Sequence, residues 1–140
     1  MEIHVLVPGD PVAKGRPRLG SGHTYTPERT RKYEELVRLS YISGTEAGER
    51  MFPDAPLEVE IVAAFHMPKK FGKAKRISAI RGEILPEGKP DIDNIAKAVL
   101  DALNGVAYRD DSRVVSLRIK KKYAECGHLT LCIRDFVTTE

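Results

Sequence analysis

The sequence predicts an α+β fold: a single compact domain over residues 1–140, in which a mixed sheet has helices packed on it. The length of 140 residues fits one domain, and a composition of 41% hydrophobic and 31% charged residues is typical of a globular protein. Stretches with the periods of strands and helices follow one another in the order β-α-β-α-β-β. Strands and helices interspersed in this way favour a mixed sheet with helices on it.

The first half of the chain predicts a strand, a basic loop, a helix and a second strand. Residues 2–7 alternate polar and apolar side chains, which indicates a strand. A loop rich in Gly and Pro follows, and Thr26 is then succeeded by Pro and Glu, which is typical of a helix start with a hydroxyl N-cap. The helical period continues to Gly44, the expected helix end. The alternation in 57–66 predicts the clearest strand.

The second half predicts a helix followed by a pair of strands. Residues 77–90 are expected to form a short helix and an exposed loop. An apolar stripe at helical spacing predicts a helix over 92–104, with Gly105 just past its end. Strands are expected at 113–123 and 128–135.

Acidic residues gather around the predicted 92–104 helix. Asp91 lies just before it, Asp93 lies in its first turn, and a short loop brings Asp110 and Asp111 to the start of the next strand. At 100° per residue, the helix face opposite the apolar stripe carries four polar side chains, and these are Asp93, Lys97, Asp101 and Asn104. The sequence therefore concentrates carboxylates and a lysine around one helix.

Two interpretations of this concentration are open from spacing alone. Mg²⁺ takes oxygen ligands, often a few carboxylates with waters and substrate phosphate, and a bound metal helps phosphodiester hydrolysis by polarising the phosphoryl oxygen and lowering the pKa of an attacking water. A lysine beside it could stabilise developing charge. In the structural interpretation, Asp93 caps the helix and pairs with Lys97, and the Asp110–Asp111 pair is a solvated turn.

Residues 89–115, KPDIDNIAKAVLDALNGVAYRDDSRVV, resemble the signature segment of the RusA family of Holliday-junction resolvases, the crossover junction endodeoxyribonucleases. The shared features are a DxDN opening, a lysine one turn later, a DALN helix end and a DD pair before a Val-rich strand. KGRPR at 14–18 and TYTPERTRKYE at 24–34 resemble the branch of the family common in prophages of Gram-positive bacteria. Arg113 departs from the pattern, since an uncharged polar residue is more usual there, and the 44–56 loop is hard to align.

The resemblance implies a site and an activity. It implies that Asp91, Asp93 and Asp111 bind Mg²⁺, for which Mn²⁺ can substitute, and that Lys97 is the essential lysine, with Asp110 the less certain half of its pair. The implied activity is resolution of four-way DNA junctions by paired phosphodiester hydrolysis, in recombination and repair, by a homodimer. A nuclease for flaps or other branched DNA, or a non-catalytic DNA-binding module, is the alternative.

Basic residues lie in separate segments around the acidic one. Patches of cations can hold a DNA backbone through its phosphates, whereas any single patch can also be an ordinary solvated surface. The net charge of +3 is compatible with a polyanionic partner without establishing one. The candidate DNA-binding residues are Lys14, Arg16, Arg18, Lys69, Lys70, Lys73, Lys75 and Arg76, and a third basic run is 120–122.

The remaining features argue against several other classes. Cys126 and Cys132 are expected to be reduced structural thiols, and the four His residues lack zinc-ligand spacing and are expected to be structural or surface residues. There is no phosphate-binding glycine motif, so no nucleotide cofactor is expected. No signal peptide and no run of 18 apolar residues is present, so we expect a cytoplasmic protein without a membrane partner.

Overall fold

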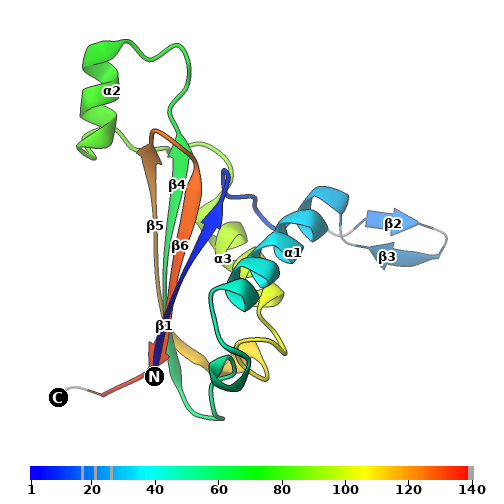
Figure 1. The fold of residues 1–140 in the computed structure, drawn as a ribbon. Coiled ribbons are helices and arrows are strands. Elements are labelled where there is room, and N and C mark those ends of the chain that lie inside the picture. Colours follow the sequence, from blue (N-terminus) through cyan, green and yellow to red (C-terminus); the bar gives the residue numbers. More distant parts are fainter. Residues whose placement is uncertain (17, 21, 26, 139–140) are drawn as a thin grey trace.

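The computed structural model describes residues 1–138 except 17, 21 and 26, and its centre is a four-stranded sheet with order β1-β6-β4-β5 (Figure 1). The strands are β1 (Glu2–Pro8), β4 (Leu57–His66), β5 (Val114–Ala124) and β6 (His128–Asp135). β5 runs parallel to β4, whereas β6 is antiparallel to both β4 and β1. The predicted α+β class with a mixed sheet is confirmed.

Two helices, α1 (Glu28–Ser43) and α3 (Ile92–Ala102), lie side by side on one face of this sheet (Figure 1). A third helix, α2 (Lys73–Ile80), stands beyond the end of the sheet at which β4 and β5 finish. A small hairpin, β2 (Arg18–Gly20) with β3 (His23–Tyr25), projects away from the sheet before α1. Two short 3-10 helices, η1 (Ala47–Glu49) and η2 (Asp111–Arg113), complete the described elements.

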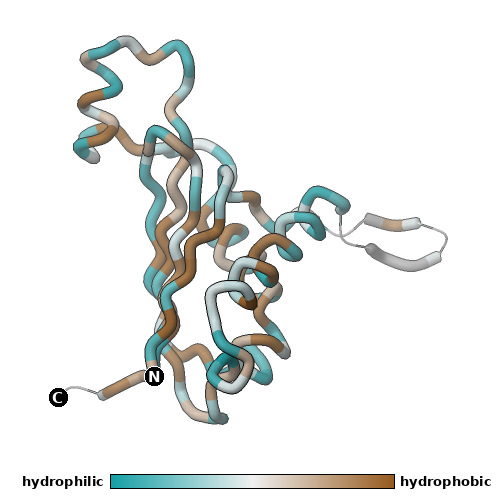
Figure 2. Tube along the Cα trace, viewed as in Figure 1, coloured by the Kyte–Doolittle hydropathy of each residue, from teal (hydrophilic) through white to brown (hydrophobic). Residues whose placement is uncertain are grey.

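The core forms where the apolar faces of α1 and α3 meet the helix-covered face of the sheet. Val59 and Ile61 of the central strand β4 and Ile95 and Val99 of α3 are essentially inaccessible to solvent. Burying one such side chain contributes about 1.5–3 kcal/mol relative to leaving it exposed. Hydrophobic residues recur along the strands and both packed helices, whereas the segment that leads to α2 is mostly hydrophilic (Figure 2). This burial fixes the orientation of α3 and therefore of the polar residues on its other side.

Several element boundaries differ from those predicted. α3 ends at Ala102, two residues before the predicted end, because the N–H groups of Leu103 and Asn104 bond to carbonyls three residues back, and Gly105 follows with a φ of +77°. The short helix expected within 77–90 instead occupies Lys73–Ile80 and so begins inside the basic segment.

The start of α1 also differs from the prediction, and its end does not. Pro27 occupies the N-cap position in an extended conformation rather than the first helical position. Thr26, the predicted N-cap, lies outside the described residues. Gly44 is the C-cap, as predicted. The β2–β3 hairpin was not predicted, since residues 18–25 show no apolar alternation. No helix in the described part of the chain is long and apolar enough to cross a membrane.

Candidate active site

The start of α3 presents two exposed carboxylates. Asp91 is the N-cap residue and Asp93 lies in the first turn, as predicted. The Asp91 side chain makes no capping hydrogen bond, although its backbone has the extended conformation of an N-cap residue. The structural interpretation gave the N-cap role to Asp93, but Asp93 lies inside the first turn and Asp91 takes the N-cap position without a side-chain capping bond.

Lys97 lies one turn further along the same helix and is also exposed. Asp93 and Lys97 are four residues apart, a spacing that allows an ion pair on a helix. Among the described residues, no ion pair within 4.0 Å joins them, nor does one involve Asp91. The lysine amine and both carboxylates are therefore free to meet a ligand.

A lysine from β5 holds the turn that leads into α3. Lys121 Nζ donates hydrogen bonds to the carbonyl oxygens of Gly88 and Pro90, at 2.6 and 2.9 Å. The peptide bond between Lys89 and Pro90 in this turn is cis. In the sequence Lys121 belongs to the basic run 120–122, whereas in the structure it fixes the turn that precedes Asp91.

The other end of α3 carries a second acidic group. Asp101 lies in the last turn, and Asp110 and Asp111 lie where η2 leads into β5. Asn104 connects the two elements, because its Oδ1 accepts a hydrogen bond from the backbone N–H of Asp111 at 2.9 Å. Asp111, predicted to bind the same metal as Asp91 and Asp93, therefore lies beside the opposite, C-terminal end of α3.

The neighbouring carboxylates of Asp110 and Asp111 have pKa values shifted in opposite directions. Asp110 accepts a hydrogen bond from the backbone N–H of Ser112 at 3.0 Å, which lowers the pKa of Asp110. Burial raises the pKa of Asp111, and the negative charges of Asp110 and Asp101 raise it further. A cation at Asp111 would relieve this unfavourable charge, whereas Asp110 already has a partner.

The two acidic groups are separated by the length of the helix. The 11 residues of α3 span roughly 16 Å at about 1.5 Å per residue. Asp91, Asp93 and Asp111 do not form a set with ligand atoms within 4.8 Å of one another; among the described residues, only Glu2, His4 and Cys132 do so. One chain thus brings Asp91 near Asp93, and Asp111 near Asp101 and Asp110, without joining the two groups.

A groove lies beside Asp91, between the loop after β1 and the first turns of α1 and α3. Both helices direct their N-terminal ends toward it, and helix N-termini favour anions. Charged and polar side chains from all three elements line the groove, and these are Arg16, Arg29, Thr30, Lys89, Asp91 and Asn94. The groove therefore combines a free carboxylate with cations suited to a phosphate. Arg29 and Lys89 were not among the predicted DNA-binding residues, because neither lies in a sequence patch with obvious spacing.

Lys14 has internal partners. Its Nζ lies 2.6 Å from Glu34 Oε2 on α1 and 3.4 Å from Asp101 Oδ2 on α3, and its backbone N–H donates to Asn94 O at 2.8 Å. Burial opposes the charge, but Glu34 and Asp101 outweigh it and raise the pKa of Lys14. Lys14 thus ties the loop to both helices, and this placement does not support its predicted DNA contact.

The basic segment around α2 is a free patch of cations. Lys69, Lys70, Lys73 and Lys75 are exposed and Arg76 is half-buried. Within the described residues none of the five is ion-paired with a carboxylate, and Lys75 lies 4.4 Å from the centre of the Phe71 ring. Arg18 lies in β2, and its side chain is outside the described part of the structure.

Comparison with known proteins identifies relatives of this chain. The family model described as Endodeoxyribonuclease RusA matches residues 8–134. A Bacillus subtilis (strain 168) protein named "Uncharacterized protein YqaN" is 34% identical over 139 residues, which cover 95% of this chain and 96% of that protein. The family match includes both ends of α3, the groove and the basic segment.

Proposed function

The chain belongs to the RusA endodeoxyribonuclease family, and from this premise we propose that it is a Mg²⁺-dependent enzyme that resolves Holliday junctions by paired phosphodiester hydrolysis. We place this activity in DNA recombination and repair in the cytoplasm. The observation that carries the proposal is the Asp91 carboxylate, which makes no helix-capping hydrogen bond. It lies in a groove that also holds Arg16, Arg29 and Lys89. Such a groove offers oxygen ligands for a metal and cations for a phosphate at the same place.

The candidate ligands fit a hard cation in chemical type. Asp91, Asp93 and Asp111 offer only carboxylate oxygens, which Mg²⁺ prefers and Mn²⁺ accepts. Burial and the neighbouring charges of Asp110 and Asp101 raise the pKa of Asp111, and a bound cation would offset these effects. When bound, the metal would polarise the scissile phosphate and lower the pKa of the attacking water.

The remaining groups are proposed to hold and orient the DNA backbone. Arg16, Arg29 and the N-terminal ends of α1 and α3 bind the phosphates that enter the groove. Lys97, exposed one turn after Asp93, stabilises the charge that develops on the reacting phosphate. Lys121 keeps the turn before Asp91 in place. The free cations at Lys69–Arg76 extend the path of the backbone beyond the sheet.

A homodimer would account for both the substrate and the separation of the acids. A four-way junction needs two symmetric cuts, and two-fold symmetry supplies two equivalent sites. One chain holds Asp93 near the start of α3 and Asp111 beside its end, and the helix between them is roughly 16 Å long. We therefore propose that each site takes Asp91 and Asp93 from one chain and Asp111 from the other.

A panel of DNA substrates tests the proposed activity. The purified protein is incubated with a four-way junction, a flap and a linear duplex, each with Mg²⁺ and with EDTA. We expect Mg²⁺-dependent, symmetric cuts in the junction and little cleavage of the duplex. Equal cleavage of the flap would indicate a general branched-DNA nuclease, and binding without cleavage in any metal would indicate a DNA-binding module.

A further inference from the structure

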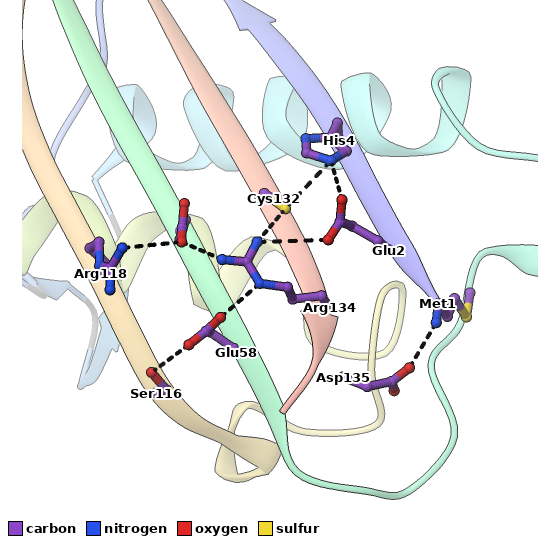
Figure 3. A network of polar contacts seen from close by, with 10 residues as sticks. Met1, Glu2, His4, Glu58, Ser116, Arg118, Cys132, Arg134 and Asp135 are labelled. Atoms are coloured by element: carbon purple, nitrogen blue, oxygen red, sulfur yellow. Dashed lines mark hydrogen bonds and ion pairs between the residues drawn. The ribbon is translucent and has the colours of Figure 1, made fainter. Parts of the chain in front are cut away.

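The face of the sheet that α1 and α3 leave uncovered carries a network of polar side chains (Figure 3). Arg134 on β6 lies at its centre. Its Nε donates to Glu58 Oε2 at 2.7 Å, another guanidinium N–H donates to Glu60, and Nη1 donates to Cys132 Sγ at 3.1 Å. Nη1 also lies 3.9 Å from Glu2 Oε1.

At one side of this network, three different ligand types meet. His4 and Cys132 are directly opposite one another in the antiparallel pairing of β1 with β6, and Glu2 lies two residues before His4 on the same face. Cys132 Sγ lies 3.7 Å from His4 Nε2, which lies 2.8 Å from Glu2 Oε2. The donor atoms of Glu2, His4 and Cys132 all lie within 4.8 Å of one another.

These separations are close to those around a tetrahedral zinc ion. With a Zn–S bond of about 2.3 Å and a Zn–N bond of about 2.05 Å, tetrahedral angles separate sulfur and nitrogen by roughly 3.6 Å. The observed 3.7 Å between Cys132 and His4 matches this value. The contact between His4 and Glu2 is that of a hydrogen bond, and it would lengthen by about 0.5 Å when both atoms bind one metal.

We propose that Glu2, His4 and Cys132 form a binding site for Zn²⁺, with the fourth position open to water. The combination of thiolate, imidazole and carboxylate suits zinc, whereas Mg²⁺ prefers oxygen ligands alone. This site lies on the uncovered face of the sheet, opposite the face that carries α3, so it is distinct from the proposed nuclease site.

The surroundings give a cation access to this site. Glu58 and Glu60 pair with Arg134 and offset its charge, and the Arg134 Nη1 group donates a hydrogen bond to the Cys132 sulfur. A hollow in this face is lined by His4, Thr130, Cys132 and Arg134, and the side chains of His4 and Glu2 are 69% and 52% exposed. A metal can reach the site without opening the core.

A bound zinc ion would link two strands that are far apart in the sequence, β1 near the N-terminus and β6 near the C-terminus. Because the ligands meet only when these strands pair, zinc would bind the folded protein. Binding that requires the folded state stabilises it. Zinc should therefore raise the melting temperature independently of any DNA or Mg²⁺.

Metal titration of the untagged full chain tests the proposal. We expect one Zn²⁺ to bind per chain, with affinity lowered by about 100-fold or more in His4→Ala and in Cys132→Ser, because even loss of a ligand's supporting partner lowers affinity 10- to 100-fold. Co²⁺ in place of zinc should give a thiolate-to-metal charge-transfer absorption band that is lost in Cys132→Ser. The exposed Cys126 provides the matched control, and Cys126→Ser should keep both the band and the affinity.

Two further variants make the result decisive. His4 is exposed, so His4→Ala tests the site even if Cys132→Ser fails to fold. Asp93→Asn should retain Zn²⁺ binding, which separates this site from the acids of α3. No Zn²⁺ binding to the wild type, equal affinity in His4→Ala, or a charge-transfer band that disappears with Cys126 would each overturn the proposal.

Discussion

The two ends of α3 use the same residue type under different conditions. At its start, Asp91 and Asp93 are exposed and form no ion pair within the described residues, and Asp91 lines a groove that also holds Arg16. At its end, Asp101 is paired with Lys14, and the pKa of Asp111 is raised by burial and by neighbouring acids. The first group is open to a ligand, whereas the second carries excess negative charge that a cation would relieve. This contrast supports the proposal that the two ends of α3 belong to one metal site shared between two chains.

The largest expected effect is the loss of cleavage when either end loses an acid. Asp93→Asn and Asp111→Asn should each lower junction cleavage by about 100-fold or more, because each removes charge that holds the metal beside the reacting phosphate. Junction binding, measured by gel shift in EDTA, should remain. Asp110→Asn is the control, since the Asp110 carboxylate already accepts the Ser112 N–H. If Asp93→Asn cleaves the junction at the wild-type rate, Asp93 at the start of α3 is not part of the site.

The next largest effect should come from loosening the turn that positions Asp91 at the start of α3. Lys121→Met removes both hydrogen bonds to the turn before Asp91, so the turn should become less ordered. We expect the Mg²⁺ concentration needed for half-maximal cleavage to rise about 10-fold, as for other partners that orient metal ligands, while cleavage at saturating Mg²⁺ changes less. Lys120→Met, on the opposite face of the same strand, should leave the requirement unchanged. An equal rise in both variants would indicate a general effect of charge.

A smaller effect should come from the basic segment, which lies outside the acidic ends. Lys69→Gln with Lys70→Gln should reduce the slope of log affinity against log salt by roughly 2, since each phosphate contact on duplex DNA contributes about 0.9. Junctions and duplexes should be affected alike, because phosphate contacts carry no base information. Lys32→Gln is the control, because Lys32 lies 3.4 Å from Glu28. If the double variant keeps the wild-type slope, this segment does not contact DNA.

The smallest expected effect is on the stability of the metal-free protein. The folded-state pKa of Asp111 lies above its ordinary value of 3.8, so the folded state binds the proton more tightly and stability falls as pH rises through this window. Asp111→Asn should therefore raise the melting temperature at pH 7 in EDTA by no more than about a few degrees, and the gain should vanish below about pH 4. Asp110→Ala should lower the melting temperature at pH 7, since the Asp110 pKa is depressed. The same sign for both variants would contradict the electrostatic difference between them.

Local patterns were sufficient to predict most of the fold. The alternation in 57–66 and the apolar stripe of the 92–104 segment identified the central strand and the helix that packs on it, since both depend on neighbouring residues. The end of α3 was predicted two residues late because Leu103 and Asn104 continue the helical pattern while their N–H groups bond three residues back. The hairpin before α1 lacks an apolar alternation that could predict it.

The sequence predicted which residues belong to the candidate site, but only part of how these residues are arranged in space. Sequence placed Asp91 and Asp93 correctly at the start of α3, because both positions are local to the helix. It could not show that Lys14 pairs with Glu34 and Asp101, or that Lys121 holds the turn at Pro90, because these contacts join distant segments. The proximity of His4 to Cys132 depends in the same way on strand pairing across almost the whole chain.

Mixing two inactive variants tests most directly whether the ends of α3 act together. Asp93→Asn and Asp111→Asn proteins are combined under conditions that exchange subunits, and nicking of a four-way junction is measured in Mg²⁺. If each site draws on both chains, a mixed dimer has one site with Asp93 and Asp111 both intact, so nicking of one strand should return. If each chain formed its own site, every site in the mixture would lack one acid. Differential labelling of the two variants confirms that subunits have exchanged. If exchange occurs and nicking does not return, the shared site is contradicted.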